Sequence, residues 1–355
     1  MHRPVVLVLR VRVPIFLAVR GLPSMGSILA RQAGAILAAL ALLVGAGLAQ
    51  AQTFSFVALG DLPYGTPAKA YPPYRQLIGA INQTMPDFSI HVGDIKSGST
   101  LCSDREFEAQ RGHFDLFEGP VVYTPGDNEW TDCHRRSNGG YEPQERLQAL
   151  RRLFFRPGLS LGARPMAVQS QADLMPEYGA FVENQRWLHQ GVLFVTVHLV
   201  GSNNNMQPEV AGALQEYALR DAANVAWIRA AFAQARSAGA RALVLAMQAN
   251  PLLGRNLFED FPKGSGFRSS IGETLLPLAA ASSLPVLLIH GDSHWYRMDQ
   301  PFSYQRQPLK QLTRLEVPGG SDVLAWRVTV NLGSAQLFSA ELIDPRRNPA
   351  VPEGR

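Results

Sequence analysis

The sequence predicts an α/β domain, and three observations support this fold class. Six apolar runs end abruptly in polar or glycine-containing turns, helical patterns separate them, and β-like segments close the chain. The runs are apolar almost throughout, which is typical of strands buried on both faces of a sheet. Strands that alternate with helices along the chain form layered α/β folds.

The predicted strands and helices follow from these patterns in order. The strand candidates are residues 54–61, 88–94, 121–129, 192–205, 243–250 and 286–294. Helices are predicted near residues 74–84, 104–117, 143–154, 220–238 and 271–282. The clearest is 220–238, where one apolar stripe at helical spacing contains Val225, Ile228, Phe232 and Ala235. Residues 134–188 indicate a long excursion with one or two helices. Antiparallel strands are expected at the end of the domain, over 313–317, 323–332 and 335–342.

The first 51 residues have the features of a secretory signal peptide. Arg31 precedes an uncharged apolar run over 33–48, and Ala49-Gln50-Ala51 has the small-residue pattern of a cleavage site. The alternative is a membrane anchor that stays uncut, but the run is shorter than the ~20 apolar residues that span a bilayer. Met25 is an alternative start, since it gives an n-region of ordinary length. We therefore expect a periplasmic or secreted protein with one domain over 52–343 and a flexible tail over 344–355, and no membrane span after cleavage.

Cleavage changes the charge of the chain. Residues 1–51 contain five arginines and no lysine or acid, so the remainder has 28 basic and 29 acidic residues. The basic isoelectric point therefore belongs to the targeting segment, and no nucleic-acid-binding face is evident.

One feature recurs at the ends of four predicted strands, where the loops of an α/β sheet gather. A Gly-Asp pair follows each of these strands, at Asp61, Asp94, Asp127 and Asp292, and His294 lies beside the last. One such pair is an ordinary turn. Four carboxylates that converge on one centre repel one another unless cations lie between them. Metal ions are the simplest explanation of the pattern.

The order of these motifs resembles the calcineurin-like metallophosphoesterases. The matching segments run from residue 54 to 300 and are Asp61-Leu62-Pro63, Gly93-Asp94, Gly126-Asp127-Asn128-Glu129, Gln248 and Gly291-Asp292-Ser293-His294. The resemblance implies two packed mixed β-sheets flanked by helices, in four layers. The sequence departs from the family where Pro63, Asp127, Gln248 and Asp292 replace its usual ligands. Tyr64 is not at the spacing of a tyrosine-ligated purple phosphatase.

The resemblance implies a site for two divalent ions. One ion would contact Asp61, Asp94 and His294, and the other Asp94, Asp127, Asp292 and Gln248, with Asp94 bridging. Because oxygen dominates this set, Mn²⁺, Mg²⁺ or Ca²⁺ suit it better than Zn²⁺, and iron is also compatible. The implied function is hydrolysis of a small phosphate mono- or diester by metal-bound hydroxide.

Other polar residues are candidates for substrate contact and proton transfer. Asn128 stands where the family has a histidine, and His198 is a candidate acid or base, although a strand-end histidine with a structural role is an equal alternative. Lys96, Asn203 and Arg297 are candidate substrate contacts, because two divalent ions only neutralise the four aspartates. The alternative function is a non-catalytic envelope protein that keeps the fold. The absence of the family's histidine ligands at Pro63, Gln248 and Asp292 favours this alternative.

The chain has two cysteines, Cys102 and Cys133. An even number in an exported chain predicts one disulfide, and two buried free thiols are the alternative.

Overall fold

The computed structural model describes residues 53–253 and 261–347, all within the unit Ala51–Arg355. The predicted signal peptide and the end of the predicted tail lie outside these residues. Among the helices of the described part, none is long and apolar enough to cross a membrane.

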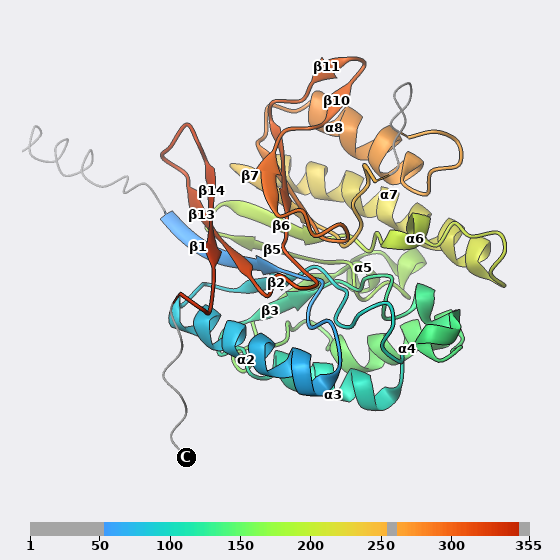
Figure 1. The fold of residues 1–355 in the computed structure, drawn as a ribbon. Coiled ribbons are helices and arrows are strands. Elements are labelled where there is room, and N and C mark those ends of the chain that lie inside the picture. The colour runs from blue at the N-terminus through green and yellow to red at the C-terminus, as the bar shows by residue number, and fades with distance from the viewer. Residues whose placement is uncertain (1–52, 254–260, 348–355) are drawn as a thin grey trace, which may run out of the picture. The chain divides into compact units, whose positions relative to one another are not determined.

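Two mixed sheets form the domain, and this confirms the predicted fold class (Figure 1). The five-stranded sheet has the order β14-β13-β1-β2-β3. Its strands are β1 (Thr53–Leu59), β2 (Ser89–His91), β3 (Val121–Tyr123), β13 (Ala325–Asn331) and β14 (Phe338–Ile343). β1, β2 and β3 are parallel, whereas β13 and β14 are antiparallel to their neighbours.

The seven-stranded sheet has the order β4-β5-β6-β7-β8-β12-β9. Its strands are β4 (Gln169–Ser170), β5 (Gln185–His189), β6 (Val192–Thr196), β7 (Ala242–Ala246), β8 (Val286–His290), β9 (Arg297–Asp299) and β12 (Leu312–Glu316). β6, β7, β8 and β12 are parallel, so the expectation of antiparallel pairing for 313–317 is wrong on its β8 side. A short hairpin pairs β10 (Ser303–Tyr304) with β11 (Gln307–Pro308).

The helices cover the outer faces of the sheets (Figure 1). They are α2 (Pro67–Gln83), α3 (Asp104–Phe114), α4 (Pro143–Phe154), α5 (Gln171–Leu174), α6 (Gly201–Asn204), α7 (Ala213–Ser237) and α8 (Leu276–Ala280). A π-helical segment, Arg268–Leu275, leads into α8, and three short 3₁₀ turns are Thr131–His134, Arg136–Asn138 and Pro176–Tyr178. The predicted helices are therefore present, although 271–282 begins as a π-helix.

Three apolar clusters show the order of the layers. Val57 and Leu59 of β1 pack with α2, α3 and α4, whereas the alternate residues Phe56 and Ala58 pack against the second sheet. In β6, Phe194 faces the first sheet and Leu193 packs with α7. Because successive side chains of a strand point to opposite faces, each central strand is apolar on both faces. The domain thus has four layers, helix, sheet, sheet and helix.

Candidate active site

The four predicted aspartates lie at the carboxyl ends of the parallel strands. Asp61, Asp94 and Asp127 follow β1, β2 and β3 of the first sheet, and Asp292 follows β8 of the second. The backbone N–H of Asp292 donates to both carboxylate oxygens of Asp61, at 3.1 Å each. The four aspartates therefore come from both sheets.

The backbone is unusual at these residues. Asp61, Asp94, Asp292 and His294 have φ values of 52°, 54°, 75° and 61°, in the left-handed region that L-residues rarely adopt. Such conformations cost on the order of 1–3 kcal/mol each and cluster at functional sites. Gly291 permits the close approach, because a Cβ there would overlap the carboxylate of Asp61.

Asp94 is the most constrained of the four acids. Its Oδ2 accepts hydrogen bonds from the Tyr64 hydroxyl and from Asn128 Nδ2, both at 2.7 Å, and its Oδ1 accepts from the Asn128 N–H at 3.2 Å. Asn128 Nδ2 also donates to the Tyr64 oxygen at 2.7 Å. Burial, followed by the charges of Asp127, Glu129 and Asp61, raises the pKa of Asp94 well above its usual range. A cation near Asp94 would remove this penalty.

Asp127 connects the first sheet to the loops after β6 and β7. Its Oδ2 accepts from Ser202 Oγ at 2.9 Å, and its Oδ1 accepts from Gln248 Nε2 at 3.2 Å. The side-chain oxygen of Gln248 accepts a hydrogen bond from the Gly201 N–H at 2.6 Å, and this bond fixes the orientation of the amide. Gln248 therefore holds Asp127 in place and has its side-chain oxygen directed at Gly201.

Asp61, Asp292 and His294 form the other half of the site. His294 Nε2 lies 3.5 Å from Asp61 Oδ1, and Asp292 Oδ2 accepts the Asn250 N–H at 3.0 Å. Burial alone would lower the pKa of His294, but Asp61 raises it. Burial and the charge of Asp127 raise the pKa of Asp292 to about 8. Burial likewise raises the pKa of Asp61 despite its contact with His294. Burial is thus the largest cause of the raised pKa values of Asp61 and Asp292, whereas the carboxylate of Asp61 raises that of His294.

Basic residues near the site are mostly engaged already. Lys96 is fully buried and donates to the carbonyl of Ser97 at 3.1 Å. Burial lowers its pKa, although Glu129 and Asp94 act in the opposite direction. Arg297 pairs with Glu316 at 2.9 Å. Two of the predicted substrate contacts are thus held by protein groups, and Lys96 has no exposed surface.

The remaining candidates, His198 and Asn203, hydrogen-bond with other groups than the four aspartates. His198 is fully buried, and its Nδ1 lies 2.8 Å from Glu183 Oε1. In the described part of the chain, its Nε2 has no hydrogen-bond partner. The Asn203 amide donates to the carbonyl of Gly264 at 3.1 Å and accepts the Gly266 N–H at 2.8 Å. These contacts give His198 and Asn203 structural roles in the protein as it stands.

Three site residues were missed by sequence reasoning. Tyr64 and Ser202 bind Asp94 and Asp127 as described, and buried Glu129 accepts the N–H groups of Asp94 and Gly126 at 3.0 and 2.7 Å. Tyr64 lies in the same turn as Asp61, and Ser202 begins the Ser-Asn-Asn-Asn run, so position in the motif was the available signal.

The predicted disulfide is confirmed. Cys102 and Cys133 are bonded, with a Cα–Cα distance of 5.8 Å. The bond links the loop after Asp94 to the loop after Asp127, and Cys102 Sγ also contacts the carbonyl of Asn128 at 3.5 Å. It therefore fixes the two loops that present the most crowded acids.

The donor chemistry fits a cation, but the side chains do not close around one by themselves. Within residues 53–253 and 261–347, no three His, Cys, Asp or Glu side chains lie close enough together to hold a metal ion. A bound ion would need additional oxygens, from amides, hydroxyls, backbone or water, or a shift of the carboxylates. Oxygen-rich sets of this kind suit Mg²⁺, Mn²⁺ or Ca²⁺.

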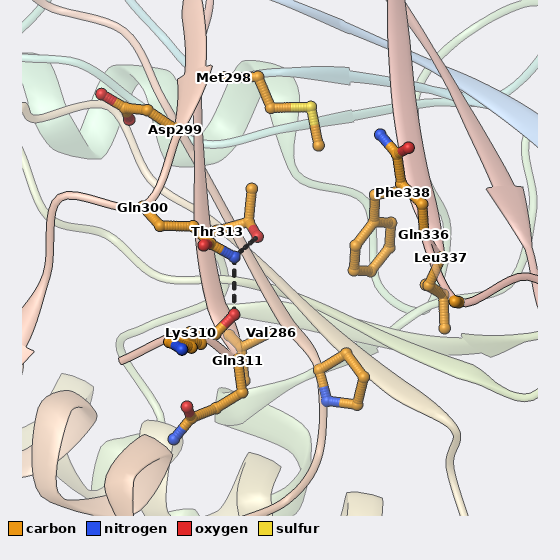
Figure 2. Close-up of a pocket in the computed structure, with 12 residues that line it drawn as sticks. Val286, Met298, Asp299, Gln300, Lys310, Gln311, Thr313, Gln336, Leu337 and Phe338 are labelled. Atoms are coloured by element: carbon orange, nitrogen blue, oxygen red, sulfur yellow. Dashed lines mark hydrogen bonds between the residues drawn. The ribbon is translucent and has the colours of Figure 1, made fainter. Parts of the chain in front are cut away.

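One cavity of about 600 Å³ lies away from this chemistry. Figure 2 shows it at the amino end of β8, near Val286, with Gln300 directed at Thr313 and at the carbonyl of Lys310. It contains none of the predicted site residues. A smaller cavity of about 270 Å³ includes Asp292, Ser202 and Asn203 in its wall, and so adjoins the carboxylates. We regard the smaller cavity as part of the site, because it touches the strand-end acids.

Comparison with known proteins gives a likeness of fold. No protein-family model matches the chain, and no similar sequence was found among the curated proteins. Similar solved structures include a purple acid phosphatase from yellow lupin seeds, at 15% identity and a TM-score of 0.46 over 83% of this chain and 54% of that one. A dimetal phosphatase from Danio rerio matches at 10% identity and a TM-score of 0.43, over 82% and 98% of the two chains.

A third similar structure is GAP50, described as the anchor in the inner membrane complex of Plasmodium. It matches at 11% identity and a TM-score of 0.43, over 82% of this chain and 89% of that one. At these identities and TM-scores, the similarity supports no conclusion about the activity of this chain.

Proposed function

We propose that the chain is an exported, metal-dependent phosphoesterase that hydrolyses a small phosphate mono- or diester. The observation that carries this proposal is the crowding of buried acids. Burial and mutual repulsion raise the pKa values of Asp61, Asp94 and Asp292. Burying carboxylates without enough nearby cations lowers the stability of the fold. Such groups with perturbed pKa values cluster at functional sites.

Asp61, Asp94, Asp127, Asp292 and His294 would hold the ions. Bound divalent ions would supply Lewis-acid stabilisation of the phosphoryl oxygens and an activated water. The protein would contribute position and shape. Gln248 and Ser202 orient Asp127, and Tyr64 with Asn128 orients Asp94. The adjoining cavity of about 270 Å³ would receive part of the substrate. Export is supported by the signal-like N-terminus.

Turnover with defined metals tests the proposal. The protein, stripped with a chelator, is incubated with nitrophenyl phosphate or bis(nitrophenyl) phosphate and Mn²⁺, Mg²⁺, Ca²⁺ or Zn²⁺. We expect hydrolysis that depends on the metal, is stronger with Mn²⁺ or Mg²⁺ than with Zn²⁺, and is lost in Asp61→Asn.

Asp299→Asn is the matched control. Asp299 pairs with Arg314 and lines the separate cavity of about 600 Å³, so this change should leave activity intact. No turnover of either ester with any of the four metals would refute the proposal.

A specific observation favours the non-catalytic alternative. Two protein donors already occupy Oδ2 of Asp94, and no three acids or histidines of the described residues surround a common point. A protein that keeps the fold for binding would show this arrangement. Metal binding without turnover would favour the alternative over the enzyme.

A further inference from the structure

Residues 293–297, which include His294 of the candidate site, are anchored to β12. The fully buried carboxylate of Glu316, on β12, accepts three hydrogen bonds from this loop. The donors are Ser293 Oγ at 2.6 Å, the Trp295 N–H at 3.0 Å and Arg297 Nε at 2.9 Å. Bonds to a buried carboxylate are among the stronger hydrogen bonds in proteins. The backbone of residues 293–297 is therefore fixed.

The indole of Trp295 is nevertheless left in solvent. The residue is 65% exposed, whereas Trp130, Trp187 and Trp227 are buried. The guanidinium of Arg297 lies 5.0 Å from the centroid of its ring. A cation at this distance over an indole face is attracted by the ring and fixes its orientation. A large aromatic surface that is held rigid and exposed is ready for a partner, since ordering it on binding costs little.

The position of Trp295 indicates the partner. It directly follows His294, which lies 3.5 Å from Asp61 and whose ring is 5.5 Å from that of Tyr64. We propose that Trp295 is a stacking platform for a flat ring in the substrate, and that the substrate is a phosphoester whose organic part carries an aromatic ring. Arg297, which pairs with Glu316 and lies against Trp295, holds that ring in position. The proposal deepens the proposed function and rests on it for the identity of the site.

Binding of two phosphoesters that differ in their ring provides the test. Adenosine monophosphate has a flat base, and glycerol 3-phosphate has none. Their affinities for the full chain are measured by calorimetry with Mn²⁺ present. Stacking of a base on an aromatic side chain corresponds to roughly 5- to 150-fold in affinity on alanine substitution. We expect Trp295→Ala to weaken adenosine monophosphate within that range and to leave glycerol 3-phosphate unchanged, while Trp295→Phe restores most of the loss.

Leu219→Ala is the control, because Leu219 is also 61% exposed but lies on α7. It should change neither affinity. The inference is overturned if the wild type binds adenosine monophosphate no more tightly than glycerol 3-phosphate, or if Trp295→Ala weakens both equally. Trp295-dependent binding without hydrolysis of any ester would refute the phosphoesterase and keep the platform. Hydrolysis of an ester, together with an unchanged preference of Trp295→Ala for adenosine monophosphate over glycerol 3-phosphate, would support the phosphoesterase and refute the platform.

Discussion

Replacing Asp94 by asparagine should remove most of the stabilisation that bound metal gives to the fold. In the metal-free protein, this change removes a buried carboxylate whose pKa is raised by burial and by Asp127, Glu129 and Asp61. The new amide can still accept from Tyr64 and Asn128, but its NH₂ group would face the N–H of Asn128. That lost bond costs about 1–3 kcal/mol, which the relief of charge repulsion offsets. Without metal, we therefore expect the stability of Asp94→Asn to be close to that of the wild type.

Added metal should separate the two proteins. A ligand that binds only the folded state stabilises it by about 2.7 kcal/mol at 100 times its dissociation constant. For a domain of about 300 residues, this free energy corresponds to a rise in melting temperature of roughly 4 °C. The wild type should show this rise with Mn²⁺, measured by calorimetry against a chelator reference, and Asp94→Asn should lose most of it.

Asp299→Asn serves as the control in this experiment too, since Asp299 pairs with Arg314 and lines the separate cavity of about 600 Å³. It should keep the full rise in melting temperature. Equal rises in the wild type and in Asp94→Asn, or no rise in either, would refute the assignment of Asp94 as a ligand.

Three further predictions concern the fold and the N-terminus. Cys102→Ser should lower the free energy of unfolding by roughly 3–4 kcal/mol, because the bond spans 31 residues, and a denaturant titration that finds no change would contradict this. Glu183→Gln should cost about 3–5 kcal/mol by leaving Arg151 buried without its partner, again by denaturant titration. Burial alone would raise the pKa of Glu183, but Arg151 and His198 lower it below its usual range. The stability that ionised Glu183 contributes is therefore present above about pH 4.3 and is lost as the pH falls. Glu183→Gln should lack this acid-sensitive part of the stability, and identical pH profiles of stability for the variant and the wild type would contradict the prediction. Sequencing of the exported protein should begin at Gln52, and a form that retains residues 33–48 would show an anchor instead of a signal peptide.

The sequence determined the layers of this protein. Strands such as Val286–His290 are apolar on both faces, and this pattern identifies a central strand without knowledge of its neighbours. The apolar pattern does not show which strand pairs with which in the sheet. The short strands β4, β5 and β9 were missed, and β12 was not placed beside β8, because pairing depends on which edges meet in space.

The same division holds at the candidate site. Gly-Asp pairs after buried strands located all four aspartates, because the carboxyl ends of parallel strands share one edge of a sheet. Only the tertiary structure showed that Tyr64 hydrogen-bonds Asp94 and that Ser202 hydrogen-bonds Asp127. It also showed that the ring of His198 contacts Glu183. Those contacts join residues up to 75 positions apart in the chain. Local sequence fixes where a side chain leaves the backbone, whereas the packing of the two sheets decides what it meets.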